Sequence, residues 1–307
     1  MSASQWKPAI FPRIAEFTRS ERANSHLARP RPPLFRALGP ADPPVQLDVD
    51  GRCYHRVEIL KHDSWAATAI YRGAAGRIVC KLNRQQPIFG IPMRWLGRFL
   101  ARREAWMLRR LEGTGHVPCL SGTISTSGRS LPHAVAHAYV PGHPLSPRER
   151  VADDFFPALQ ALLRKMHAEG IAYVDLHKRE NIIVGDDGCP YLIDFQISFA
   201  LPHGWLRRSR LCRGILRMFQ EGDDYHLLKH WAIHRADQCG VTLKELGHRR
   251  PWWIRAHRSI AVPFRTLRRM LLVVLRIRTG QGMVDSECFA EDAVRNDGGA
   301  IRPRAAA

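Results

Sequence analysis

Two carboxylates and one amide in the middle of the chain have the types and spacing that phosphoryl transfer requires. Asp175 follows a stretch expected to be helical, Asn181 comes shortly after it, and Asp194 ends an apolar run that begins at Tyr191. Phosphoryl transfer needs a carboxylate that orients or deprotonates the acceptor hydroxyl, and Mg²⁺ prefers carboxylate, amide and phosphate oxygens as ligands. Asp175 suits the first role, whereas Asn181 and Asp194 suit the second.

The elements that must position these residues follow an order of strands first and helices later. Asp187 and Gly188 lie between two apolar runs and predict a hairpin that ends at Asp194. Strands are expected at 56–61, 65–71, 78–82 and 134–139, and helices at 93–112, 155–168, 206–219, 223–234 and 254–274. This order is typical of an α+β chain with a small sheet lobe and a larger helical lobe.

Three motifs resemble the protein kinase superfamily. The segment 173–181, Tyr-Val-Asp-Leu-His-Lys-Arg-Glu-Asn, is similar to the family's H-R-D-L-x-x-x-N loop, and 194–196, Asp-Phe-Gln, is similar to its D-F-G motif. Ile-Val-Cys-Lys at 78–81 matches the V-A-I-K strand, and the resemblance covers about residues 55–235. It implies a two-lobed protein-kinase-like fold, with a small antiparallel-sheet N-lobe and a mainly helical C-lobe. It also implies a phosphotransferase that uses ATP and Mg²⁺.

The resemblance implies where ATP binds. Lys81 would hold the nucleotide phosphates, and Glu104 on the following helix would pair with Lys81. Ala136 and Ala138 belong to the segment that would face adenine. No G-x-G-x-x-G motif occurs between the first two expected strands, so residues 61–67 would form the turn that covers the phosphates.

The resemblance also assigns the catalytic side of the site. Asp175 would act on the acceptor hydroxyl, and Asn181 and Asp194 would bind Mg²⁺. His177 or Lys178 would take the place of the lysine that contacts the transferred phosphate.

Several residues depart from the family pattern. Five residues separate Asp175 from Asn181, where the family has four, so Glu180 stands at the family's asparagine spacing and is a rival metal ligand. Tyr173 replaces the family histidine, and Gln196 replaces the glycine of D-F-G. No A-P-E motif follows, and the short activation segment resembles the atypical bacterial kinases of the RIO type and the Kdo/lipopolysaccharide kinases.

Other interpretations stay open for the same residues. Lys81 could be a lysine whose stem lies along the sheet, Glu104 one of many exposed charge pairs, and Asp175 and Asn181 turn formers. The altered spacing and the missing glycines favour a pseudokinase that acts as a nucleotide-binding or interaction module. Asp194 is harder to explain structurally, because a carboxylate next to an apolar strand needs a partner when it is buried.

The net charge of the chain indicates which kinds of partner it would attract. The net charge is +19, and residues 203–280 hold 17 Lys/Arg against 5 Asp/Glu. Such a surplus favours contact with phosphates or an anionic membrane, although a solvated basic face is the simpler explanation. The acceptor classes are a protein Ser/Thr and a lipid-linked sugar. Trp252-Trp253 and a basic helix at 265–278 are candidates for core packing or interfacial contact, and no recognised nucleic-acid motif occurs.

The composition also indicates domain organisation and compartment. Residues 1–50 are proline-rich and are expected to form an arm with one short helix at 10–22. The N-lobe is expected at 51–140, the C-lobe at 141–280, and a disordered tail at 281–307. Seven scattered cysteines and the absence of a secretory signal favour the cytoplasm, with peripheral contact at the inner membrane face as an open alternative. Asp224 is expected to anchor the Asp175 loop or to cap its helix.

Overall fold

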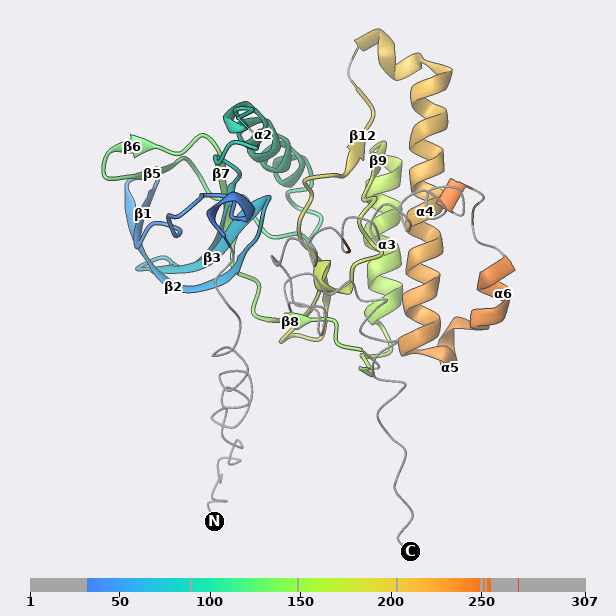
Figure 1. Cartoon of the computed structure of the whole chain (residues 1–307). Helices are drawn as coiled ribbons and strands as arrows, with labels where there is room; N and C mark the ends of the chain where they lie inside the picture. The colour runs from blue at the N-terminus through green and yellow to red at the C-terminus, as the bar shows by residue number, and fades with distance from the viewer. Residues whose placement is uncertain are drawn as a thin grey trace, which may run out of the picture. The chain divides into compact units, whose positions relative to one another are not determined.

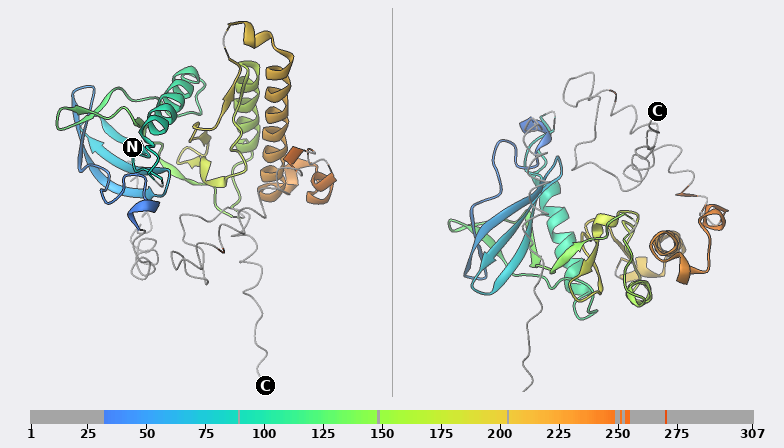
Figure 2. Two further views of the ribbon diagram at one scale, coloured as in Figure 1. Left: turned by 45° about the horizontal axis from the view of Figure 1, so that its top comes forward. Right: turned by 90° about the horizontal axis from the view of Figure 1, so that it is seen from below.

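The computed structural model describes residues 32–248 except 89, 148 and 203, together with residues 251, 253, 254 and 270. The expected helix at 10–22, the basic helix at 265–278 and the tail at 281–307 therefore lie outside the described residues, apart from Met270. The described part is α+β, as predicted: a curled antiparallel sheet carries helix α2, and helices α3 and α4 lie side by side (Figures 1 and 2).

A seven-stranded sheet in the order β6-β5-β1-β2-β3-β4-β7 forms the first part of the described chain. Its strands are β1 (Gln46–Val49), β2 (Arg52–His62), β3 (Ala66–Gly73), β4 (Gly76–Asn83), β5 (Ile124–Thr126), β6 (Arg129–Ser130) and β7 (Ala134–Ala138). Sequence analysis found the four longest of these strands but placed none before residue 56. The short strands were missed because two or three residues cannot show an alternating pattern.

Residues 1–50 were expected to form an arm, but the end of this stretch forms strand β1. β1 pairs with both β2 and β5, and Leu47 is fully buried in the sheet core. Arg84, itself buried, donates hydrogen bonds to the carbonyl groups of Leu34, Ser64, Gln86 and Pro87. This guanidinium satisfies four backbone carbonyls at once, so the proline-rich segment from residue 32 onward belongs to the folded unit.

Five α-helices and three short 3₁₀-helices complete the described secondary structure. They are η1 (Pro33–Phe35), α2 (Arg94–Arg110), α3 (Phe155–Ala168), η2 (Arg179–Asn181), η3 (Gly204–Arg208), α4 (Arg210–His234), α5 (Ala236–Cys239) and α6 (Leu243–His248). α4 is one continuous helix, where two helices were expected. Gly222 lies between the two expected helices and permits close packing, because an added Cβ would lie 2.7 Å from the ring of Trp253. Trp253 also packs on Phe219, which favours the core role over an exposed one.

Two small sheets connect the helices to the candidate site. β8 (Gly142–Pro144), β10 (Ile182–Gly185) and β11 (Pro190–Leu192) form one, and β9 (Ile171–Ala172) and β12 (Phe199–Ala200) form the other. The β10–β11 hairpin confirms the turn predicted at Asp187-Gly188. It places Asn181 just before its first strand and Asp194 just after its second.

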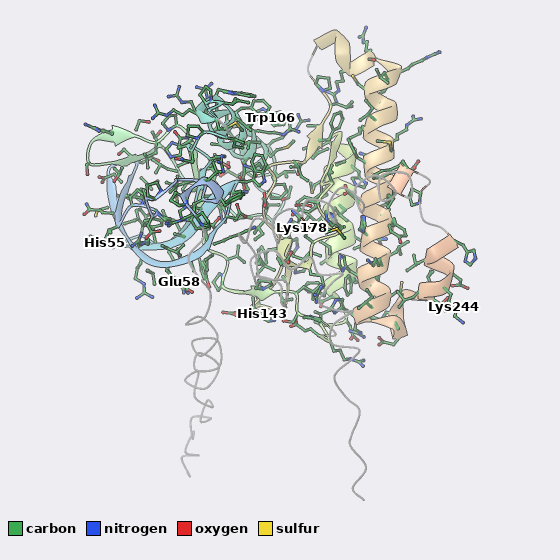
Figure 3. The ribbon with its side chains drawn as sticks, viewed as in Figure 1. His55, Glu58, Trp106, His143, Lys178 and Lys244 are labelled. Atoms are coloured by element: carbon green, nitrogen blue, oxygen red, sulfur yellow. The ribbon has the colours of Figure 1, made fainter. Side chains whose placement is uncertain are left out.

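The buried apolar residues form two clusters. One lies in the sheet and includes Leu47, Tyr71 and Cys80. The other surrounds α3 and includes Leu159 and Met166, together with Ile182, Val184 and Leu192 of the β10–β11 hairpin. Lys81 comes from the sheet and Lys178 from the loop beside α3 (the latter is labelled in Figure 3). The candidate residues are therefore supported by both clusters.

Candidate active site

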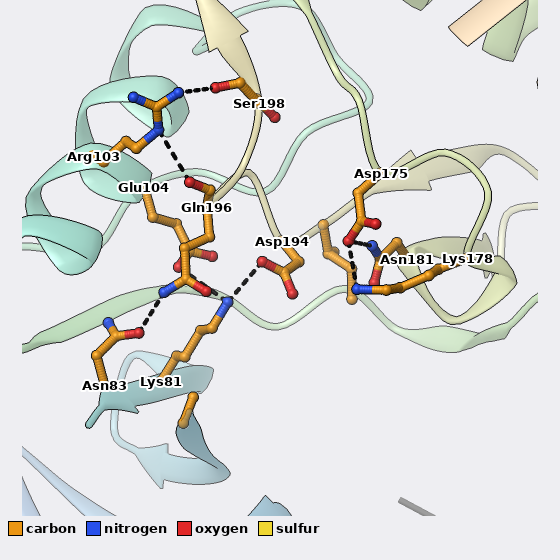
Figure 4. Close-up of polar contacts among 12 residues, drawn as sticks. Lys81, Asn83, Arg103, Glu104, Asp175, Lys178, Asn181, Asp194, Gln196 and Ser198 are labelled. Carbon is orange, nitrogen blue, oxygen red and sulfur yellow. Dashed lines mark hydrogen bonds and ion pairs between the residues drawn. The ribbon is translucent and has the colours of Figure 1, made fainter. Parts of the chain in front are cut away.

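Lys81 is the centre of a charged triad with one carboxylate on either side. Its Nζ atom lies 2.7 Å from Asp194 Oδ1 and 3.2 Å from Glu104 Oε2 (Figure 4). Lys81 comes from β4 and Glu104 from the buried face of α2, so the expected pair is present. Asp194 joins it from a position 113 residues away along the chain.

Burial and charge shift the three groups of this triad in different directions. Burial opposes the charge of Lys81, but the carboxylates of Asp194 and Glu104 outweigh it and raise the pKa of the ammonium above its ordinary value. Burial raises the pKa of Glu104 to about 7, although Lys81 acts against this. Burial also opposes ionisation of Asp194, yet Lys81 holds the pKa of that carboxyl below its usual value. Lys81 and Asp194 are therefore the charged pair, and Glu104 titrates near neutrality.

Asp194 is held in an unusual backbone conformation. Its φ angle is 60°, in the left-handed region, two residues after the end of β11. Tyr173 donates a hydrogen bond from its hydroxyl to the carbonyl of Ile193, and its ring packs edge-on against buried Phe195 at 5.3 Å. Lys81 is therefore one partner of the carboxylate that was expected to need one when buried.

Asp175 lies opposite the triad. One of its carboxylate oxygens accepts hydrogen bonds, and the other accepts none. Oδ2 accepts hydrogen bonds from Lys178 Nζ at 2.8 Å and Asn181 Nδ2 at 2.9 Å. Oδ1 is buried without a hydrogen-bond donor, although His177 Nδ1 lies 3.3 Å away. The loop thus brings together Asp175, His177, Lys178 and Asn181, as predicted. Lys178 also lies near enough to Asp194 for its charge to lower the pKa of that carboxyl, behind the larger effects of burial and Lys81.

A buried carboxylate from α4 holds the backbone of this loop. Asp223 accepts hydrogen bonds from the amides of Tyr173 at 2.6 Å and Val174 at 2.8 Å. Its Oδ2 also lies 3.3 Å from His167 Nε2. Val174 has a φ angle of 74°, which is costly for a β-branched residue, so the clamp fixes a strained turn immediately before Asp175.

The prediction that Asp224 anchors the Asp175 loop is therefore wrong, because its neighbour Asp223 does so. Asp223 is buried, whereas Asp224 is exposed. The signal that distinguishes them is helical spacing, because Asp223 shares its face of α4 with buried Leu227, His230 and His234. His230 adds a second support, since its Nε2 atom lies 2.8 Å from the carbonyl of Leu176.

The structure places Asn181, and not Glu180, against Asp175. Both residues belong to η2, but Asn181 is buried and bonded to Asp175, while Glu180 is exposed. Glu180 therefore does not reach the position for which the sequence spacing suggested it.

The side chains of Ala136 and Ala138 are on the wrong face of β7 to meet a ligand beside Lys81. Lys81 is registered with Val135, and Ala136 with Cys80. Registered partners share a face of the sheet, so Ala136 and Ala138 point away from the face that carries Lys81. The backbone is occupied as well, because the Ala138 amide donates to Cys119 and the Ala136 carbonyl accepts from Ser121.

His137 is the residue of β7 on the Lys81 face, and sequence analysis did not select it. It is buried, and its Nδ1 atom lies 2.9 Å from the carbonyl of Ala138. Burial lowers its pKa below the ordinary value, so this imidazole is neutral near pH 7. The alternation of β7 could have revealed it once the register with β4 was known.

The turn expected to cover phosphates has its own carboxylate. Asp63 Oδ1 accepts hydrogen bonds from the amides of Trp65 at 2.7 Å and Ala66 at 3.0 Å. Lys61 Nζ lies 2.8 Å from Asp63 Oδ2. The amides of Trp65 and Ala66 and the ammonium group of Lys61 could have bound phosphate, but Asp63 already pairs with all three. The expectation for residues 61–67 is not supported by this geometry.

Gln196 has a structural role that its place in the motif did not predict. Its side-chain amide donates to Asn83 Oδ1 at the end of β4, and its carbonyl accepts from Arg103 Nε at 3.1 Å (Figure 4). Arg103 also donates to the carbonyl of Ser198. The segment after Asp194 is therefore attached to α2 and to β4, the two elements that carry Glu104 and Lys81.

The oxygen atoms around the site fit a hard divalent cation. Asn181 offers an amide oxygen, and Asp194 offers a carboxylate whose side chain is 34% exposed. Carboxylate and amide oxygens with remaining water positions suit Mg²⁺. No group of three or more His, Cys, Asp or Glu residues that could hold a metal ion occurs in the described part of the chain.

Comparison with known proteins adds no further assignment. No known family model matches this sequence, and no curated protein sequence is significantly similar to it. Among the described helices, none has the length and apolar character needed to cross a bilayer.

Proposed function

We propose that this chain is an ATP-dependent phosphotransferase with a two-lobed protein-kinase-like fold. The observation that carries the proposal is the meeting of two independent constellations. Lys81 is paired with both Glu104 and Asp194, and Asp175 is fixed by Lys178 and Asn181 on the facing loop. Residues from four separate segments converge in the order that the kinase resemblance implies, and a solvated charge pair would not require this convergence.

Each residue has a role that its environment supports. Lys81, kept protonated by two carboxylates, would bind the phosphates of ATP. Asn181 and Asp194 would hold Mg²⁺, which when bound neutralises phosphate charge. Asp175 would accept the proton of the acceptor hydroxyl through its buried Oδ1, and His177 or Lys178 would contact the transferred phosphate. Val174 and Asp223 fix the loop geometry before any substrate arrives.

The catalytic role of Asp175 has a direct test. Replacing Asp175 with Asn should lower phosphoryl transfer by about 10²–10⁴-fold, because the carboxylate that positions and deprotonates the hydroxyl is lost. Asp186→Asn is a matched control, since Asp186 is an exposed carboxylate at the tip of the β10–β11 hairpin. Turnover would be measured with Mg-ATP against two acceptor panels, proteins and lipid-linked sugars. Equal turnover in the wild type and the Asp175→Asn variant would contradict the proposal.

The metal role of Asn181 is separable from the role of Asp175. Asn181→Ala should raise the Mg²⁺ concentration needed for half-maximal ATP binding, whereas Glu180→Ala should leave it unchanged because Glu180 is exposed. Titration of Mg²⁺ at fixed ATP measures both variants. The reverse result would assign the ligand to Glu180.

A second candidate function is a pseudokinase that binds nucleotide without transferring phosphate. The observation that favours it is Asp63, whose carboxylate already occupies two amides of the turn expected to cover the phosphates. Under this alternative, Mg-dependent ATP binding would persist in the wild type while phosphoryl transfer to both acceptor panels would be absent.

A further inference from the structure

Helix α2 carries an exposed aromatic stripe on the side opposite Glu104. Its buried residues are Gly97, Ala101, Glu104, Met107 and Leu108. Trp95 and Phe99 are 64% and 54% exposed, and Trp106 is 36% exposed. With spacings of four and seven residues, these three aromatic side chains fall on one line of the helix, facing away from the core.

Unpaired arginines flank this stripe. α2 contains six arginines and a single acid, the buried Glu104. Arg94, Arg98, Arg102 and Arg109 are exposed, and no acidic side chain within the described ranges forms an ion pair with any of them. By contrast, Arg103 and Arg110 bind backbone carbonyls of Gln196 and Glu169. The four exposed arginines therefore have no ion-pair partner in the described part of the chain, although Arg109 lines a pocket that also contains Asp50.

This combination identifies the chemistry of the partner. Trp and Phe next to Arg are the residues that settle at the boundary between headgroups and acyl chains, and anionic headgroups attract the arginines. In Figure 1, α2 lies above the sheet, and it contacts β4 and β7. The outer face of a helix presents its side chains to a flat surface, whereas nucleic-acid bases stack on aromatics within a groove.

We propose that the outer face of α2, comprising Trp95, Phe99, Trp106 and the four unpaired arginines, docks on an anionic phospholipid surface. α2 is separate in sequence from the basic stretch at 203–280. The inner face of the same helix carries Glu104, which pairs with Lys81. Docking would thus hold the helix that positions the charged triad, and the inference does not depend on phosphoryl transfer.

Vesicle sedimentation of the full chain tests this inference. Phosphatidylcholine vesicles with and without phosphatidylglycerol would be compared, at low and high salt. The wild type should sediment with the anionic vesicles only, and less at high salt. The double variant Trp95→Ser/Phe99→Ser should bind these vesicles about tenfold more weakly, because two half-exposed aromatic side chains no longer enter the interface.

Two further variants control this measurement. Val57→Ser/Leu60→Ser removes two apolar side chains of β2 that are similarly exposed, at 56% and 52%, and should leave binding unchanged. Arg98→Gln/Arg102→Gln/Arg109→Gln removes only charge and should weaken vesicle binding about fivefold for each of these arginines that contacts the membrane surface. Thermal unfolding of every variant shows that the fold is kept, and the charge variant tests the surface even if the aromatic variant fails to fold.

Three results would overturn the inference. The first is that the wild type fails to sediment with anionic vesicles. The second is that the aromatic and arginine variants of α2 sediment as well as the wild type, which would place the membrane contact elsewhere. The third is that single-stranded oligonucleotides bind through Trp95 and Phe99 while anionic vesicles do not, which would assign the stripe to nucleic acid.

Discussion

Lys81 and Asp175 are the central residues of the two sides of the candidate site, and different interactions hold them. On the Lys81 side, three ionisable side chains balance one another, and the pKa of each is shifted. On the Asp175 side, the buried carboxylate of Asp223 binds two backbone amides and fixes the loop itself. The first arrangement depends on protonation. The second is set when the chain folds.

The largest effect is expected from breaking the backbone clamp. Asp223→Ala leaves two buried amides without acceptors and should lower the free energy of unfolding by about 4 kcal/mol. Chemical denaturation measures this change, and Asp224→Ala is the matched control because its side chain is exposed. Equal losses for the two variants would show that the clamp does not hold the loop.

The Lys81 side should instead respond to pH. Burial raises the pKa of Glu104 to about 7, so the folded chain keeps a proton that the unfolded chain loses near its ordinary pKa. This contribution to stability is full at low pH and is lost as the pH rises toward 7. The difference in unfolding free energy between wild type and Glu104→Gln should therefore fall by about 3 kcal/mol over that window.

Denaturation at a series of pH values measures this difference. Subtracting the Glu104→Gln curve removes the buried histidines, which act in the opposite direction. For example, burial lowers the pKa of His230 to about 3, so its contribution is lost as the pH falls below the ordinary histidine value. A pH-independent difference would mean that Glu104 is ionised throughout, and the contrast between the two sides would disappear.

Strain in the Asp175 loop can be measured at Val174. A glycine relieves the left-handed conformation, so Val174→Gly should cost about 1–2 kcal/mol less than Val79→Gly. Val79 is the matched control, since it is also half-buried but lies in the regular strand β4. Unfolding free energies measure both, and equal costs would show that Val174 is unstrained.

The smallest effect is expected at the Asp63 turn. This turn belongs to the Lys81 side of the site, but, like the Asp175 loop, it is held by a carboxylate that accepts hydrogen bonds from backbone amides. Asp63→Ala should lower the free energy of unfolding by about 1 kcal/mol, because the turn is near the surface and water can replace the lost bonds. Asp186→Ala should have no measurable effect. A loss as large as that of Asp223→Ala would show that exposure does not weaken such a clamp.

Much of the site could be predicted because its local signals are strong. The Asp-Gly turn located the β10–β11 hairpin, and with it Asn181 and Asp194. Alternation placed Lys81 in a strand, and a helical pattern placed Glu104 on the element that follows. Each of these features depends on residues that are close in sequence, so it can be recognised without knowledge of the fold.

The remaining features depended on contacts between distant residues. The assignment of Asp223 in place of Asp224 follows from the rotation of α4 against the loop, and the exclusion of Ala136 from the Lys81 face follows from strand register. Spacing alone favoured Glu180 as the rival of Asn181, but η2 turns it to the solvent. The sequence by itself determined which residues are near the site. Only the tertiary structure decided which of two neighbours points inward, because one residue of rotation or register reverses the direction of a side chain.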